Sequence, residues 1–326
     1  MATHRSSQQE NLRALHEFRG AYTDLRDLIR LRYAAREISD LADNKTSNPL
    51  AGLLTSNFRG RGIDFAEVRV YQPGDDVRTI DWRVTARTQV AHTKLFQEEK
   101  ERPVLILTDQ SASMFFGSQV TFKSVLAART AALIAWASLE AGDRVGGIVF
   151  SEQGHREIRP RRSKHSVLRL LNELNDFNHA LKRDSATMDA TYSDNYFTEA
   201  LGNVRRVSKH GSVIYIISDF NNFSEESRIH LQPLAQHNDV IGIHVSDRLE
   251  QQLPSPDMYS ITNGSQRTRI NTASRKHRQA YEQGFQQQLA GIQEEFMRVK
   301  SPLLTLQTHH SIVEGLNRQA GMAVPA

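Results

Sequence analysis

Short, mainly apolar runs alternate with segments of helical periodicity from residue 103 onward. Apolar runs of this kind are typical of strands that are buried on both faces of a parallel sheet. They predict strands over 104–107, 144–150, 212–218, 239–245 and 303–307. The segments between them predict helices over 122–139, 166–177, 196–208, 225–236 and 274–300. Because strand and helix alternate, we expect an α/β fold with a doubly wound, mostly parallel, Rossmann-like sheet over residues 103–326.

Two long helices have a clear apolar stripe. The stripe of the last helix is Tyr281, Phe285, Leu289, Ile292, Phe296 and Val299. The first helix, predicted over 11–40 within an N-terminal segment of residues 1–48, has the stripe Leu15, Phe18, Tyr22, Leu25 and Ile29. Its other faces are rich in arginine, which is compatible with a docking helix for an acidic partner. We favour the alternative that this helix packs on its own domain and leaves a basic side in solvent.

Residues 49–102 differ from the rest of the chain because charges of both signs interrupt short apolar pieces. Alternation predicts strands over 65–71 and 91–98, with a turn at Pro73-Gly74 between them, in a small β-containing subdomain. We expect its charged residues to form a partly buried ion network: Arg61, Asp64, Arg69, Asp75, Asp76, Arg78, Asp81 and Arg83. Trp82, between an acid and a base, could anchor this subdomain against the main sheet or bind an external partner. Trp82 and Arg83 are therefore the candidate partner-binding residues, because Trp and Arg often dominate protein interfaces.

Composition narrows the classes of protein. The 326 residues are 39% hydrophobic and 24% charged, with a formal net charge of +4, and no apolar run is long enough to span a membrane. The first residues lack the apolar core of a secretory signal. The absence of cysteine excludes disulfides, thiolate catalysis and cysteine-bound zinc. We therefore expect a cytoplasmic protein.

Oxygen-bearing side chains follow two of the predicted strands. Asp109, Ser111 and Ser113 come directly after the first strand of the sheet, and Asp219 comes directly after the strand at 212–218. The carboxyl ends of parallel strands share one edge, where open α/β sheets bind ligands. Carboxylate and hydroxyl oxygens suit Mg²⁺, Mn²⁺ or Ca²⁺, and so few charges leave a position for an outside carboxylate. The other interpretation is that Asp109 only caps a turn.

Two resemblances follow from these residues. The pattern Asp109-x-Ser111-x-Ser113, with Asp219 after a later strand, is similar to the metal-ion-dependent adhesion site of von Willebrand factor type A domains. The charged stretch from Gly60 to Arg87, with Tyr-x-Pro-Gly-Asp-Asp-x-Arg-x-Ile-Asp-Trp-Arg at its centre, resembles the signature of family 58 of the domains of unknown function. That resemblance implies a von Willebrand A-like fold and a chaperone-like role, with a MoxR-type AAA+ ATPase as partner, in assembling or activating other proteins.

The resemblance also implies a threonine ligand that this chain does not supply at the usual place. The nearest hydroxyls are Ser193 and Thr198, and Thr198 is the candidate. Many relatives carry membrane segments ahead of the signature, where this chain has a predicted amphipathic helix instead.

Three classes of function remain. The first is a non-enzymatic adaptor, in which a bound Mg²⁺ takes its last ligand from an Asp or Glu of a partner protein. The second is a Mg²⁺-dependent phosphoryl-transfer enzyme with Asp109 as nucleophile, which needs a nearby lysine that the motif does not provide. The third is a basic protein that binds nucleic acid or an acidic surface, but the most basic stretch, residues 156–164, lacks the aromatic residues that stack on bases. We favour the adaptor.

Overall fold

The structure is a computed structural model that describes residues 20–43, 62–72, 75–99, 102–181, 195–262, 267–310 and 312. It divides into two compact units, which are described separately. The main unit consists of Met1–Ser56 and Pro103–Ala326, and the inserted unit is Asn57–Arg102. No helix in the described part of the chain has both the length and the apolar character that a membrane crossing requires.

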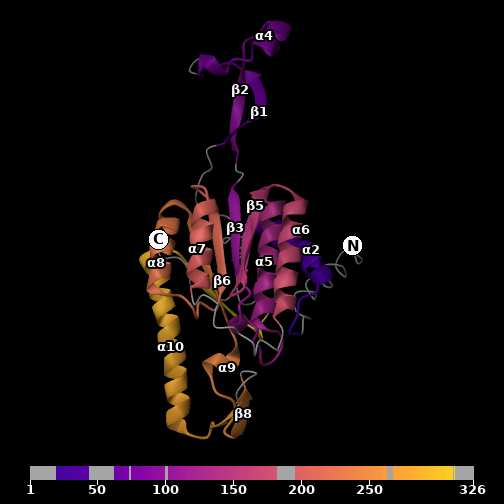
Figure 1. Cartoon of the computed structure of the whole chain (residues 1–326). Coiled ribbons are helices and arrows are strands. Elements are labelled where there is room, and N and C mark those ends of the chain that lie inside the picture. The colour runs from indigo at the N-terminus through magenta and orange to yellow at the C-terminus, as the bar shows by residue number, and fades with distance from the viewer. Residues whose placement is uncertain are drawn as a thin grey trace. The chain divides into compact units, whose positions relative to one another are not determined.

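The main unit is built on a six-stranded sheet with the order β10-β7-β6-β3-β4-β5 (Figure 1). Its strands are β3 (Pro103–Asp109), β4 (Arg144–Ser151), β5 (Gly154–Arg161), β6 (Val213–Ser218), β7 (Asp239–Ser246) and β10 (Leu303–Gln307). All neighbouring pairs are parallel except β4 and β5, which form an antiparallel hairpin at one edge. The prediction of an α/β fold with a mostly parallel sheet is therefore confirmed.

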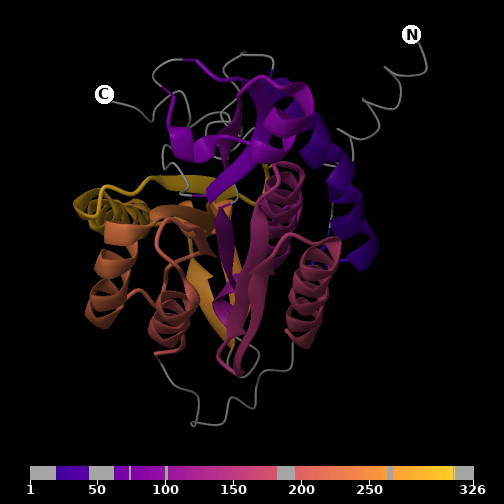
Figure 2. The same ribbon diagram turned by 90° about the horizontal axis from the view of Figure 1, so that it is seen from above.

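Helices cover both faces of this sheet (Figure 2). The helices are α2 (Leu25–Asp43), α5 (Lys123–Glu140), α6 (Lys164–Ala180), α7 (Tyr196–Val207), α8 (Glu225–His237), α9 (Arg248–Gln251) and α10 (Arg275–Arg298). Alternate residues of β3 enter different cores: Val104 and Ile106 pack with α2, α5 and α6, whereas Leu105 and Leu107 pack with α7, α8 and α10. This double burial explains why the strands read as uninterrupted apolar runs.

The first described helix begins later than the sequence predicted. Gly20 pairs with Thr121, and the backbone N–H of Thr23 donates to Asn178 Oδ1 of α6 at 2.7 Å, so the chain is held extended until α2 begins at Leu25. The predicted helical residues 11–19 lie outside the described part. Leu28 is buried in the core, and its carbonyl accepts a hydrogen bond from the Trp136 indole at 3.1 Å. The described part of this helix thus packs on its own domain.

The last helix, α10, is buried over only part of its length. Ile292 and Phe296 are buried, whereas Tyr281 is 40% exposed and Phe285 and Leu289 are partly exposed. The prediction that one continuous stripe enters the core was therefore wrong for the first half of the helix. Figure 1 shows why, because α10 starts well beyond the edge at which β3 and β6 end. The small hairpin of β8 (Met258–Thr262) and β9 (Arg267–Asn271) precedes it.

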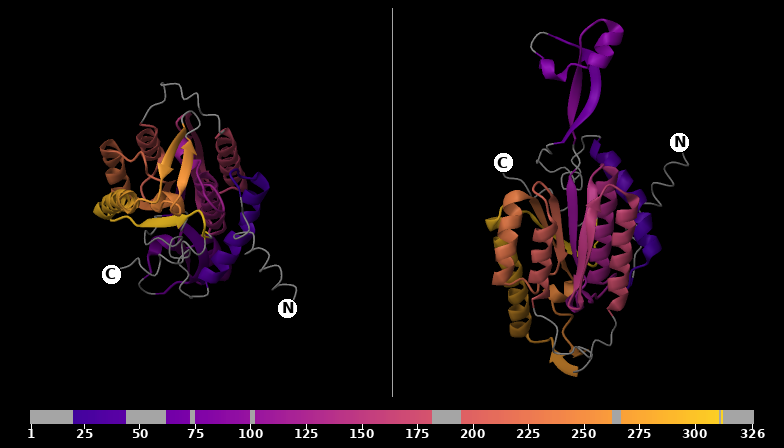
Figure 3. Two further views of the ribbon diagram at one scale, coloured as in Figure 1. Left: turned by 90° about the horizontal axis from the view of Figure 1, so that it is seen from below. Right: turned by 45° about the horizontal axis from the view of Figure 1, so that its top comes forward.

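The inserted unit is an antiparallel pair, β1 (Gly62–Val70) and β2 (His92–Glu99), that carries two short helical segments between its strands (Figure 3). These are η1 (Val77–Thr79) and α4 (Trp82–Thr88), and the sequence did not predict α4. In the described part of the predicted ion network, two of the acidic residues cap helical segments and one ion pair is present. Asp76 accepts from a backbone N–H of η1 and Asp81 from two of α4, while Arg69 and Asp75 pair at 2.7 Å. The turn at 73–74 and the side chains of residues 61 and 64 lie outside the described residues.

Candidate functional site

The candidate site begins where β3 and β6 end side by side. The register pairs Thr108 with Ile217, so the next residues, Asp109 and Ser218, are neighbours across the sheet. The Ser218 hydroxyl donates to Asp109 Oδ2 at 2.6 Å. Asp219 follows immediately, and its charge raises the pKa of Asp109. Two segments of the chain that are far apart in sequence thus bring Asp109 and Asp219 to one edge of the sheet.

Asp109 is a buried carboxyl group with a perturbed pKa. Its side chain is almost inaccessible, with the residue 2% exposed, and its other oxygen, Oδ1, accepts from the Ser111 backbone N–H at 2.9 Å. Burial raises the pKa of Asp109, the negative charge of Asp219 raises it further, and hydrogen bonds from Ser218 and Ser111 oppose both, leaving it at about 7. The site therefore favours either a proton or an added cation beside Asp109.

Two hydroxyls complete the oxygen cluster. Ser111 and Ser113 place their Oγ atoms 3.2 Å apart, on and beside the short segment η2 (Ala112–Met114). The backbone N–H of Ala112 donates to Glu152 Oε1 at 2.7 Å, which anchors this loop to the end of β4. Burial raises the pKa of Glu152. The loop after β3 is therefore fixed by a hydrogen bond between its two hydroxyls and by a backbone hydrogen bond to Glu152.

The structure adds a residue that sequence reasoning missed. Lys123, the first residue of α5, is fully buried at 0% exposure, and its ammonium donates to Asp219 Oδ2 at 2.8 Å and to Glu250 Oε1 at 2.5 Å. Burial alone would lower the pKa of Lys123, but the two carboxylates outweigh burial and raise it. The ammonium therefore neutralises part of the acidic charge at this edge. The sequence did contain a signal for this residue, since a lysine at the first position of an otherwise apolar helix needs a nearby acid.

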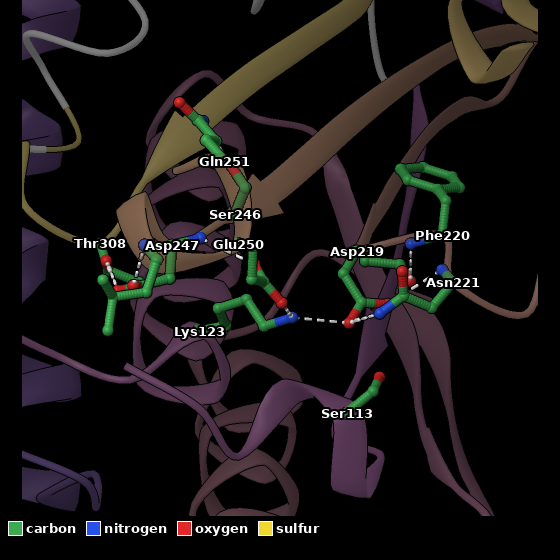
Figure 4. A network of polar contacts seen from close by, with 12 residues as sticks. Ser113, Lys123, Asp219, Phe220, Asn221, Ser246, Asp247, Glu250, Gln251 and Thr308 are labelled. Atoms are coloured by element: carbon green, nitrogen blue, oxygen red, sulfur yellow. Dashed lines mark hydrogen bonds and ion pairs between the residues drawn. The ribbon is translucent and has the colours of Figure 1, made fainter. Parts of the chain in front are cut away.

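The lysine also joins the site to the end of β7 (Figure 4). Glu250 Oε2 accepts from the Asp247 backbone N–H at 2.8 Å. Asp247 in turn accepts from the Ser118 backbone N–H at 2.9 Å and from the Thr308 hydroxyl. Burial opposes these donors, which nevertheless lower the pKa of Asp247. One polar network therefore runs from the ends of β3 and β6 to the ends of β7 and β10.

The other predicted site residues have different surroundings. The Thr198 hydroxyl lies 2.8 Å from Ser227 Oγ and 3.2 Å from Ser224 Oγ, so it binds the start of α8. Trp82 is 71% exposed on α4 of the inserted unit, and Arg83 beside it is also exposed. The structure thus brings together Asp109, Ser111, Ser113 and Asp219, and gives Thr198 partners of its own.

The chemistry of the cluster fits a hard cation that keeps part of its water shell. Among the described residues no three His, Cys, Asp or Glu side chains converge on one point, so a fully protein-enclosed ion has no site in that part of the chain. Two carboxylates and two hydroxyls match the incomplete, all-oxygen shell that Mg²⁺ accepts. Asp219 Oδ2 already has Lys123 and the Asn221 amide as donors, whereas Oδ1 has the Asn221 backbone N–H. Asp219 Oδ1 therefore accepts fewer hydrogen bonds than Oδ2 and is the oxygen more available to a cation.

Comparisons with known proteins place the chain among uncharacterised relatives. The family model described as protein of unknown function DUF58 matches residues 67–291. An uncharacterised protein of Mycobacterium bovis, Mb1516, is 28% identical over 228 residues, which cover 69% of this chain and 68% of that protein. The uncharacterised protein Rv1480 of Mycobacterium tuberculosis matches equally. Among solved structures, the conserved hypothetical protein BatB from Bacteroides thetaiotaomicron aligns with a TM-score of 0.40 at 15% identity, covering 68% of this chain and 98% of that one.

Proposed function

The chain belongs to the protein family of unknown function DUF58, and we propose that this member is a non-enzymatic, metal-dependent protein-interaction module. One observation carries the proposal. Asp109, buried and with its pKa raised by Asp219, lies at the same sheet edge as the paired hydroxyls of Ser111 and Ser113. A cluster of hard oxygens whose acidic charge is only partly neutralised, here by Lys123, suits a divalent cation.

In this proposal Mg²⁺, or Mn²⁺ or Ca²⁺ in its place, is bound by four residues: Asp109, Ser111, Ser113 and Asp219. The bound ion would supply a positive, incompletely coordinated face for an Asp or Glu of a partner protein. Ser218 and the Ser111 backbone orient the Asp109 carboxylate, and Asn221 orients that of Asp219. Thr198 remains the candidate threonine ligand, and its hydroxyl lies 2.8 Å from Ser227 Oγ at the start of α8, so the proposal does not depend on it.

The finer parts of the proposal come from the resemblance described above. We propose a von Willebrand A-like arrangement of the sheet and its metal edge, and a MoxR-type AAA+ ATPase as the partner in assembling or activating other proteins. The described arrangement supports the first part, since the acidic loops leave the carboxyl ends of parallel strands. The ATPase partnership rests on the family resemblance alone.

The structure gives less support to the two other classes of function. Lys123 and Asp219 supply the lysine and the second acid that a phosphoryl-transfer site would need, but a nucleophile must also reach its substrate, and Asp109 is buried with both oxygens accepting hydrogen bonds. The basic stretch on β5 is partly neutralised, because Glu157 pairs with Arg206 at 3.1 Å and with Arg159 at 3.8 Å. We therefore keep the interaction module as the single proposal.

The first experiment measures metal binding directly. Free Mn²⁺ is counted by electron paramagnetic resonance while the full chain is titrated, and Mg²⁺ is then added as competitor. We expect one Mn²⁺ per chain that Mg²⁺ displaces, and at least a tenfold loss of affinity in Asp109→Asn. Asp176→Asn, at an exposed position of α6, is the matched control. Equal Mn²⁺ affinity in wild type and Asp109→Asn would end the proposal.

The second experiment tests the partner. A MoxR-type ATPase from the same organism is passed over immobilised chain in Mg²⁺ and in EDTA. Retention in Mg²⁺ that is lost in EDTA and in Asp109→Asn supports the adaptor role. Retention that is unaffected by EDTA would separate the partnership from the metal.

A further inference from the structure

A pocket of about 450 Å³ lies beside the metal site, under the first half of α10. The edge of the sheet and α9 contribute Asp219, Asn221, His244 and Glu250, and α10 contributes Tyr281 and Phe285. This volume lies within the range of natural ligand sites, roughly 300–1,000 Å³. The incompletely buried stripe of α10 is thus the wall of a cavity that has one acidic end.

The wall of the pocket is aromatic and held in place. The Tyr281 hydroxyl donates to the Leu249 carbonyl at 2.9 Å, and the Gln288 amide donates to Asn221 Oδ1 at 2.7 Å, which ties α10 to the rim. Phe285 lies 6.2 Å from the His244 ring, centroid to centroid. These contacts leave two ring systems along the pocket without filling it.

A glycine lies on the pocket wall in the interior of α10. Gly284 is exposed, and a Cβ added to it would meet no atom within 4 Å. A helix-interior glycine weakens a helix relative to alanine, and no neighbour in the described part of the chain requires one here. The lack of a side chain at this position keeps the pocket open.

The polar end of the pocket has more acceptors than donors. Asp219 and Glu250 carry two negative charges against the single positive charge of Lys123. His244 is 4% exposed, and its Nδ1 has no hydrogen-bond partner among the described residues. Burial lowers the pKa of His244 to about 4, so the ring is neutral at physiological pH and brings no compensating charge. His244 thus adds a neutral aromatic surface, and no positive charge, to the pocket wall.

We propose that this pocket receives the guanidinium group of an arginine side chain from a partner protein. A guanidinium carries one positive charge and donors only, stacks on aromatic rings, and is more weakly hydrated than an ammonium. It thus complements the excess negative charge, the ring of His244 and the walls formed by Tyr281 and Phe285. A carboxylate would meet the like charges of Asp219 and Glu250. This site shares Asp219 with the proposed metal centre, but it needs no bound ion.

The test uses the full chain and the blocked tripeptide acetyl-Ala-Arg-Ala-amide, with the citrulline tripeptide as a neutral probe of nearly the same shape. Binding is measured by calorimetry and by amide shifts of α10. We expect the arginine peptide to bind at least tenfold more tightly than the citrulline peptide, and Glu250→Gln to weaken it several-fold. Gly284→Leu should abolish binding. The matched control is Gly291→Leu, since Gly291 is an exposed α10 glycine outside the pocket and also has open space around it.

Several outcomes would overturn the inference. Equal affinity for the arginine and citrulline peptides would refute the argument from charge. Equal losses of peptide affinity in Gly284→Leu and Gly291→Leu would show that the peptide does not bind in this pocket. Free L-arginine amide binding as tightly as the tripeptide would refute a partner protein as the source. Mn²⁺ binding measured on Gly284→Leu should equal that of wild type. If Asp109→Asn still binds the arginine peptide, the pocket proposal stands even when the metal proposal fails.

Discussion

Replacing Asp109 by Asn gives the sharpest test of the electrostatics at the sheet edge. The amide keeps the size of the side chain, and its oxygen can still accept from the Ser111 backbone N–H. The Ser218 hydroxyl can accept from the new NH₂ group as readily as it now donates to the carboxylate. The main physical change is therefore the loss of one buried negative charge beside Asp219.

The size of the effect follows from the pKa of Asp109. In the folded chain the value is raised from the ordinary 3.8 to about 7, by burial first and by Asp219 second. The folded state therefore holds this proton more tightly than the unfolded state, and the stability that protonation provides is present below pH 4 and lost as pH rises through about 7. At about 1.4 kcal/mol per pH unit, wild type should lose roughly 3 kcal/mol relative to Asp109→Asn as pH rises from 5 to about 7, and little more up to pH 8.

The assay is urea unfolding of both proteins at pH 5, 6, 7 and 8 in EDTA. The chain has two tryptophans, and Trp136 is buried in the core of the main unit while Trp82 is exposed on the inserted unit. A Trp82→Phe background therefore makes fluorescence report the main unit alone. The difference between the two proteins removes the contributions of all other titrating groups.

Two results decide the matter. Parallel pH profiles for wild type and Asp109→Asn would refute the claim that a charged Asp109 is held unfavourably beside Asp219. The second result concerns Mg²⁺ at pH 8. A cation that binds the folded site adds stability in proportion to the logarithm of its concentration over its Kd, so wild type should gain stability and the variant should gain much less.

Three further substitutions test separate parts of the structure. Lys123→Met should lower the free energy of unfolding by about 3–5 kcal/mol, because it leaves the buried Asp219 and the half-buried Glu250 without their shared cation; urea unfolding measures this. Thr198→Val should cost about 1–2 kcal/mol by removing the hydrogen bond to Ser227, which keeps only its longer contacts with Ser224, and Mn²⁺ affinity should be unchanged. Gly242→Ala should lower stability by about 1–3 kcal/mol, because its Cβ would lie 2.5 Å from the buried Phe296 ring; calorimetric melting measures this, and an unchanged Tm would contradict the packing.

The order of strands and helices after residue 103 could be predicted because burial on both faces leaves a simple mark. β6 is apolar over residues 213–217 and β7 over residues 240–243, and both strands are buried along nearly their whole length, which is typical of a sheet covered on both sides. The same topology brings Asp109 and Asp219 to one edge. Both statements depend on local composition and on the direction of parallel strands, which a single sequence reveals.

Elements that depend on tertiary context were missed. α4 has seven residues and no apolar stripe, and Asp81 starts it by capping, so hydrophobic periodicity did not reveal it. Lys123 was not singled out from the sequence, because the two acids that it contacts come from segments that follow β6 and β7, far away in the chain. The first half of α10 has the spacing of a core helix, but the sheet ends before it, which periodicity does not show.

Asp219 connects the two proposed sites, and this sets their relationship. Its carboxylate lies in the cluster with Asp109, accepts the Lys123 ammonium, and also lines the pocket under α10. A divalent cation held by Asp219 would withdraw negative charge from the pocket, while a guanidinium in the pocket would withdraw it from the cation. If both sites bind as proposed, their electrostatic coupling is unfavourable and reciprocal. Raising Mg²⁺ should then weaken the arginine tripeptide in wild type and leave its affinity unchanged in Asp109→Asn.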